Sequence, residues 1–124
     1  MTENFIEKIG RLRSVLAENG FSEIDYNYSD LHFGNEYVVY DNGGLKIRIL
    51  KDRGYYVVDI QISRDREWHS AERVLKVLSM ECQGEFVDAK TDCEDQWTSV
   101  CENISLNIHL LSTSMCERLL SKIE

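Results

Sequence analysis

The sequence predicts an α+β fold with helices packed on one face of an antiparallel meander sheet of four strands, a fifth strand being left open. Two observations carry this prediction. A helical apolar pattern changes near residue 20 to an alternation with a period of two, and the alternating stretches that follow are joined by short turns. Helical patterns return only after residue 70. A helix, then strands, then two or three helices is an order typical of an α+β domain.

The first helix is expected from residue 3 to residue 18. Thr2 is a suitable N-cap in front of an acidic first turn, and Asn19-Gly20 supplies a left-handed stop. Apolar residues recur at spacings of four, three and four, which places them on one side of a helix. These residues are Phe5, Ile9, Leu12 and Leu16.

Four strands are expected over residues 23–28, 37–40, 45–50 and 55–62, where apolar and polar residues alternate. Asp41-Asn42-Gly43-Gly44 is a hairpin signal, and Lys51-Asp52-Arg53-Gly54 is interpreted as a type I turn closed by a glycine with positive φ. The resulting sheet has one buried and one wet face. The buried set is Leu45, Ile47, Ile49, Tyr56, Val58, Ile60 and Ile62; the outward set is Lys46, Arg48, Asp59 and Gln61.

A second helix is expected to begin after the cap residue Ser70 and to end near Gln83-Gly84. Residues 85–89 fit a short strand or a loop. A helical apolar stripe then continues from Trp97 to Leu119. The sequence leaves open whether Ser112-Thr113-Ser114 divides this stripe into two helices.

Length and composition indicate one domain over residues 1–124, since a chain of this size supports a single hydrophobic core. The N-terminus has no basic and apolar leader, and no apolar run approaches the roughly 18 residues of a membrane span. We therefore expect a cytoplasmic protein. The four cysteines form no CxxC motif, so we expect them to be reduced and expect neither a metal site nor a cofactor.

Motifs for catalysis are missing from the sequence. No phosphate-binding glycine motif and no GxSxG elbow occurs, and the three histidines lie far apart, in a loop, before a helix and on an apolar helix. The chain is therefore expected not to be an enzyme. Two alternatives stay open: a small hydrolase or ligand-binding protein with a pocket between the sheet and the last helix, using His109 or His32, and an acidic adaptor or secretion-chaperone-like protein with an exposed apolar groove.

The net charge of -8 is concentrated in two blocks. Residues 18–41 hold six acids and no base, and residues 81–102 hold seven acids with Lys90 as their only base. Such surfaces repel nucleic acid and attract a basic protein. The predicted partner contacts are Glu81, Glu85, Asp88, Asp92, Glu94 and Asp95, followed by Glu23, Asp25, Asp30 and Glu36.

A further pattern lies between residues 31 and 78. It consists of Phe33-Gly34-Asn35, Tyr37-Val38-Val39-Tyr40, Leu45-Lys46-Ile47-Arg48-Ile49, the stretch from Asp52-Arg53-Gly54 to Ile60, and Trp68. It resembles small bacterial immunity proteins encoded beside polymorphic toxins, including those of contact-dependent growth inhibition systems. The resemblance implies a cytoplasmic inhibitor that binds one cognate toxin domain, often a nuclease, over or beside its active site. The oligomeric state is left open.

Overall fold

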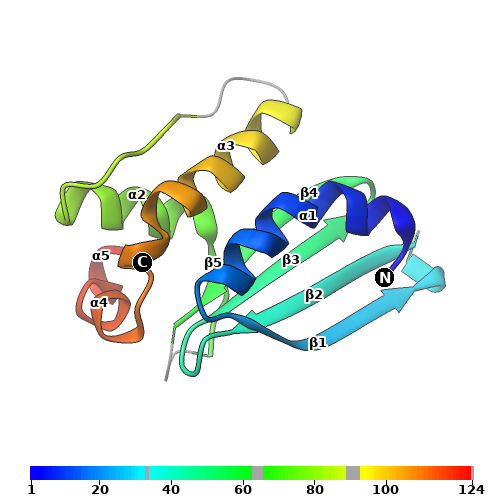
Figure 1. The fold of residues 1–124 in the computed structure, drawn as a ribbon, viewed down its shortest axis with the longest axis horizontal. Coiled ribbons are helices and arrows are strands. Elements are labelled where there is room, and N and C mark those ends of the chain that lie inside the picture. Colours follow the sequence, from blue (N-terminus) through cyan, green and yellow to red (C-terminus); the bar gives the residue numbers. More distant parts are fainter. Residues whose placement is uncertain (33, 63–65, 89–92, 124) are drawn as a thin grey trace.

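The computed structural model describes residues 1–32, 34–62, 66–88 and 93–123, and the side chains of His32, Thr113 and residues 93–95 lie outside this description. It confirms the α+β prediction (Figure 1). The elements in chain order are α1 (Glu3–Glu18), β1 (Ser22–Ser29), the short 3-10 helix η1 (Asp30–His32), β2 (Asn35–Asp41), β3 (Lys46–Asp52), β4 (Tyr55–Gln61), β5 (His69–Ser70), α2 (Ala71–Glu81), α3 (Cys93–Asn107), η2 (Ile108–Leu110), α4 (Thr113–Arg118) and α5 (Leu120–Ile123).

Helix α1 has the predicted limits and caps. The Thr2 hydroxyl oxygen accepts the N–H of Phe5 at 3.3 Å, which satisfies one of the free donors of the first turn. At the other end Gly20 has a φ of +85°, a backbone conformation that glycine adopts without steric cost. The predicted apolar face of α1 is buried, which confirms the periodicity argument.

The sheet is an antiparallel meander in the order β1-β2-β3-β4-β5. Ile47 pairs with Ile60 on the inner face, which is buried beneath α1. On the other face Arg48 lies opposite Asp59 and forms an ion pair of 2.9 Å with it. The Trp68 ring covers that pair, with the Arg48 Cζ 4.3 Å from the ring centroid. The predicted division into a buried and a polar face is therefore confirmed.

The turn between β3 and β4 differs from the prediction. Asp52 pairs with Tyr55, so only Arg53 and Gly54 form the loop, and both have positive φ, 52° and 86°. Two such residues define a type I′ turn, whose twist matches that of the flanking strands, rather than a type I turn. Asn35 stabilises it, because its side-chain oxygen accepts the N–H of Arg53 at 2.9 Å.

The C-terminal helices complete the core beside α1. Helix α3 contacts both α1 and β4, and α2 contacts β4 and β5. The Tyr56 ring joins these layers, since its centroid lies 6.1 Å from that of Phe5 and 5.4 Å from that of Trp97. Each of these aromatic contacts connects residues from different elements.

The open question about Ser112-Thr113-Ser114 is answered by the structure. The helical stripe is interrupted there, because Ser112 is the N-cap of α4 and its hydroxyl accepts the N–H of Met115 at 3.3 Å. Ser70 occupies the predicted N-cap position of α2 but forms no side-chain capping bond. The described part of the predicted strand or loop at 85–89, residues 85–88, has no regular secondary structure, and Ala89 lies outside the described residues.

Candidate functional site

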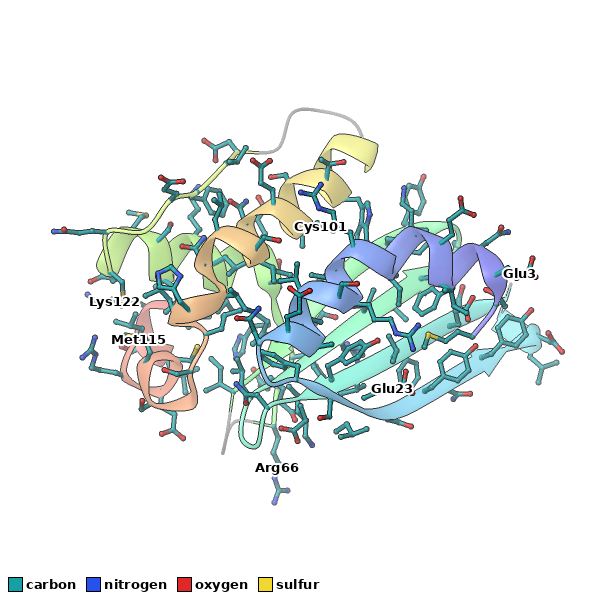
Figure 2. All side chains as sticks on the ribbon, in the orientation of Figure 1. Glu3, Glu23, Arg66, Cys101, Met115 and Lys122 are labelled. Atoms are coloured by element: carbon teal, nitrogen blue, oxygen red, sulfur yellow. The ribbon has the colours of Figure 1, made fainter. Side chains whose placement is uncertain are left out.

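The first acidic block lies along an open side of the sheet. Strand β1 is the first strand of the meander, and its outer side is therefore an edge of the sheet. Glu23 and Asp25 on β1 are exposed, as are Glu18 at the end of α1 and Asp30 in η1. Figure 2 shows Glu23 at the lower margin of the ribbon. No base occurs in the sequence between Arg13 and Lys46, so these carboxylates have no oppositely charged neighbour along the chain.

Large apolar side chains are exposed beside these acids. A β-bulge shifts the register between Glu23 and Asp25, and the side chain of Ile24 between them is 51% exposed. Tyr28 is 43% exposed and Leu31 is 92% exposed. We call the seven side chains together the edge surface: Glu18, Glu23, Ile24, Asp25, Tyr28, Asp30 and Leu31.

Glu36 does not belong to this surface, which corrects the sequence prediction for that residue. Its side chain lies on the inner face of β2 and is 1% exposed. The carboxylate accepts hydrogen bonds from the Thr2 hydroxyl, from the Thr2 N–H at 3.3 Å and from the Tyr26 hydroxyl at 2.6 Å. These bonds fasten the N-terminus of α1 to strands β1 and β2. A buried and fully engaged carboxylate cannot contact a partner.

The same network sets the protonation of its members. Burial by itself raises the pKa of the Glu36 carboxyl, but the hydrogen bonds from Thr2 and Tyr26 stabilise the carboxylate more strongly, so its pKa lies below the usual value. Burial and the bond to Glu36 raise the pKa of Tyr26 to about 12. At neutral pH Glu36 is therefore an acceptor and Tyr26 a donor.

The second acidic block is only partly described. Glu85 and Asp88 are exposed, whereas Glu81 forms an ion pair with Lys122 at 2.9 Å. Asp92 and the side chains of Glu94 and Asp95 lie outside the described residues. Two apolar side chains accompany the described acids, with Met80 72% and Val87 38% exposed. We call this set the loop surface: Met80, Glu81, Glu85, Val87 and Asp88.

Three polar side chains of α3 hold the segment that carries the loop surface. Asn103 binds the backbone of Val87 twice: its oxygen accepts the Val87 N–H at 2.7 Å and its amide donates to the Val87 carbonyl at 2.8 Å. The Ser99 hydroxyl donates to the same carbonyl at 2.7 Å, and Asn107 donates to the Glu85 carbonyl at 2.7 Å. We call these residues the α3 ladder: Ser99, Asn103 and Asn107. All three are buried.

Gly84 allows this close packing. A Cβ at this position would lie 2.5 Å from the Asn107 side-chain oxygen, a distance at which the two groups overlap. The preceding Gln83 has a φ of +56°, which turns the chain after α2 toward α3. Sequence reasoning missed the α3 ladder, although polar residues at spacings of four within an apolar helical stripe are a readable signal.

We expect Asn103→Ala to loosen the segment 84–88 and to destabilise the protein by about 1–3 kcal/mol, because the Val87 N–H loses its described hydrogen-bond partner. Limited proteolysis should cut the variant within this segment faster than the parent protein, and urea denaturation should give the loss of stability. Ser105→Ala is the matched control, since Ser105 lies on the same helix and its described hydrogen bond is to the Cys101 carbonyl of its own helical turn. Equal cleavage rates in the two variants would contradict the role given to the α3 ladder.

The two surfaces lie on different parts of the molecule. In Figure 1 β1 runs along the lower right margin, whereas α2 and the segment after it lie at the left. Figure 2 likewise separates Glu23 from Lys122, the partner of Glu81. The edge surface and the loop surface therefore form two separate sites rather than one continuous acidic face.

The histidines do not form a site in the described residues. His109 is exposed in η2, His69 pairs with Ile60 in β5, and the side chain of His32 is not described. A hollow of about 130 Å³ lies between β4, α2 and α3, which is where the hydrolase alternative places its pocket. Its described lining contains one carboxylate, Glu72, and no histidine.

The described cysteines are thiols. Cys82, Cys101 and Cys116 are reduced, and burial, with a smaller contribution from the neighbouring Cys82, raises the pKa of the Cys116 thiol to about 12. Within the described part of the chain, no group of three or more histidine, cysteine, aspartate or glutamate side chains is placed to hold a metal ion.

Comparisons of the chain with protein-family models, with curated proteins and with solved structures gave no match. The helices of the described ranges include none with the length and apolar character needed to cross a membrane.

Proposed function

We propose that this chain is a bacterial immunity protein that binds and neutralises a cognate toxin domain in the cytoplasm, with the edge surface as its main contact. The observation that carries the proposal is the uncompensated acidic strip along β1 with three large apolar side chains exposed beside it. Protein interfaces combine an apolar centre with a charged rim that steers the partner, and the edge surface has both components. The resemblance of residues 31–78 to immunity proteins supports the class.

The charge of the edge surface indicates the chemistry of the partner. A domain that acts on nucleic acid carries lysine and arginine side chains that hold the phosphate backbone. Four exposed carboxylates, of Glu18, Glu23, Asp25 and Asp30, are complementary to such a surface. A basic nuclease domain is therefore the partner that fits best. By binding such a domain, this acidic chain would cover the lysine and arginine side chains with which the nuclease holds nucleic acid.

The edge surface is favoured over the loop surface for two reasons. Glu81 of the loop surface is already paired with Lys122, whereas no ion pair is described for the acids of the edge surface. The edge surface also exposes three large apolar side chains, Ile24, Tyr28 and Leu31, against two on the loop surface, Met80 and Val87. The acids of the loop surface therefore serve as controls for charge changes on the edge surface.

The test begins with the gene immediately upstream of the one that encodes this chain. We expect it to encode a large secreted protein, and its small basic C-terminal domain should co-purify with this chain after co-expression and be harmless in its presence. Association measured by stopped flow should slow as salt rises, because screening weakens the attraction between the charged surfaces. If the purified domain and this chain form no complex even at low salt, the proposal is wrong.

A further inference from the structure

Strand β1 leaves one side of its backbone open. Neighbouring residues of an antiparallel strand direct their N–H and C=O groups alternately to the two sides. One set in β1 therefore points to β2, its partner in the sheet, and the other set points outward. Among the described residues, no segment pairs with the outer side of residues 23–28. From this open edge we infer that β1 accepts an extended basic segment of the toxin domain as an added sixth strand of the sheet. The inference rests on the proposed function.

The edge is long enough to hold a strand. β1 contains eight residues, Ser22–Ser29, more than a typical strand of five or six. Natural sheets protect such edges by shortening, covering, bulging or charging them. The bulge at Ile24 and the carboxylates of Glu23 and Asp25 are the protections present here, and no described element covers the strand.

These charges decide what can pair with β1. A second copy of the chain would place two strips of negative charge about 4.8 Å apart, the distance between neighbouring strands, and like charges facing one another across a sheet destabilise the pair. A strand with lysine or arginine side chains beside Glu23 and Asp25 gains attraction in the same place. The acids therefore oppose self-association and favour one kind of partner.

The apolar side chains of the edge surface add contact area. Glu23 lies opposite Tyr40 of the inner face, whereas Asp25 lies opposite Val39 of the other face. After the bulge, Tyr28 pairs with Glu36 and faces the inner side as well. An added strand would therefore meet carboxylates on both faces and a half-exposed tyrosine ring on one. Main-chain hydrogen bonds supply affinity in this mode of binding, and the alternating side chains supply specificity.

Hydrogen exchange of individual backbone amides, followed by NMR, tests the inference on this chain alone and bound to the C-terminal domain encoded upstream. The amides of residues 23–28 that exchange fast in the free chain should slow by more than about tenfold in the complex, because each becomes a donor to the added strand. The amides already bonded to β2 serve as internal references. The amides of β5, at the opposite edge of the sheet, should not change.

The outcomes separate this inference from the proposed function. A complex in which the fast amides of β1 keep their exchange rates would overturn strand addition and leave the immunity proposal standing. A complex that instead protects the amides of residues 84–88 would place the contact on the loop surface and likewise overturn it. Failure to form any complex would reject both proposals.

Discussion

Replacing Glu36 with alanine is expected to lower the free energy of unfolding by about 2–4 kcal/mol, since the change removes a buried acceptor that is engaged by three donors. The Tyr26 hydroxyl would lose its described acceptor inside the fold. Thr2 would no longer hold the start of α1 against β2. Urea denaturation of the parent protein and of Glu36→Ala, followed by circular dichroism, measures the difference.

Glu117→Ala is the matched control for this substitution. Glu117 is an exposed acid on α4, and its removal should change stability by less than about 0.5 kcal/mol. Tyr26→Phe should show an intermediate loss, because it removes one of the three donors and leaves the carboxylate in place. A Glu36→Ala variant as stable as the Glu117→Ala variant would show that the network does not hold α1.

The pKa shift of Glu36 predicts how the stability of the folded protein changes with pH. The pKa of Glu36 is lower in the folded protein than in the unfolded chain, so the folded state favours its ionised form. Its contribution to stability is complete above the unfolded pKa and disappears as the pH falls through the folded pKa. Glu36→Gln should therefore lose part of the decline in stability that the parent protein shows below the ordinary glutamate pKa.

Reversing two charges on β1 should have the largest effect on binding. We expect Glu23→Lys combined with Asp25→Lys to slow association with the basic toxin domain by about 10- to 100-fold at low salt, because the edge surface would repel the partner that it now attracts. Both side chains are exposed, so the fold should be retained. Stopped-flow association rates at two salt concentrations, with a melting curve for each variant, measure the effect.

Glu85→Lys combined with Asp88→Lys makes the same change of net charge on the loop surface, away from β1. This control should alter the association rate far less, since the acids of the loop surface lie away from β1. Equal slowing by the two double variants would mean that net charge, rather than the edge surface, attracts the partner. Slowing by the control alone would assign the contact to the loop surface.

The parts of the fold that were predicted correctly depend on local signals. The limits of α1 follow from Thr2 and Gly20, and the facing of Ile47 and Ile60 follows from alternation. The type of the β3–β4 turn was missed because Arg53 adopts a positive φ, which arginine residues rarely do. That conformation is supported by Asn35, a residue distant in the sequence.

The candidate site was less predictable than the fold. The distribution of charge along the chain indicates both acidic blocks. It does not distinguish Glu36, which is buried, from the exposed acids of the first block. Its alternation with Val38 and Tyr40 places it on the buried face, and the donors that make this acceptable come from α1 and β1. The separation of the two blocks depends on how α2 and α3 pack, which no local pattern specifies.

The α3 ladder has a consequence for how this protein can diverge. Its bonds to the segment 84–88 all end on backbone atoms, the Val87 N–H and the carbonyls of Glu85 and Val87. The side chains displayed at positions 85, 87 and 88 can therefore be exchanged without removing the bonds that hold them. Mutation or design can therefore place new binding side chains at these three positions, while the unchanged residues of α3 keep the backbone of the segment in the same conformation.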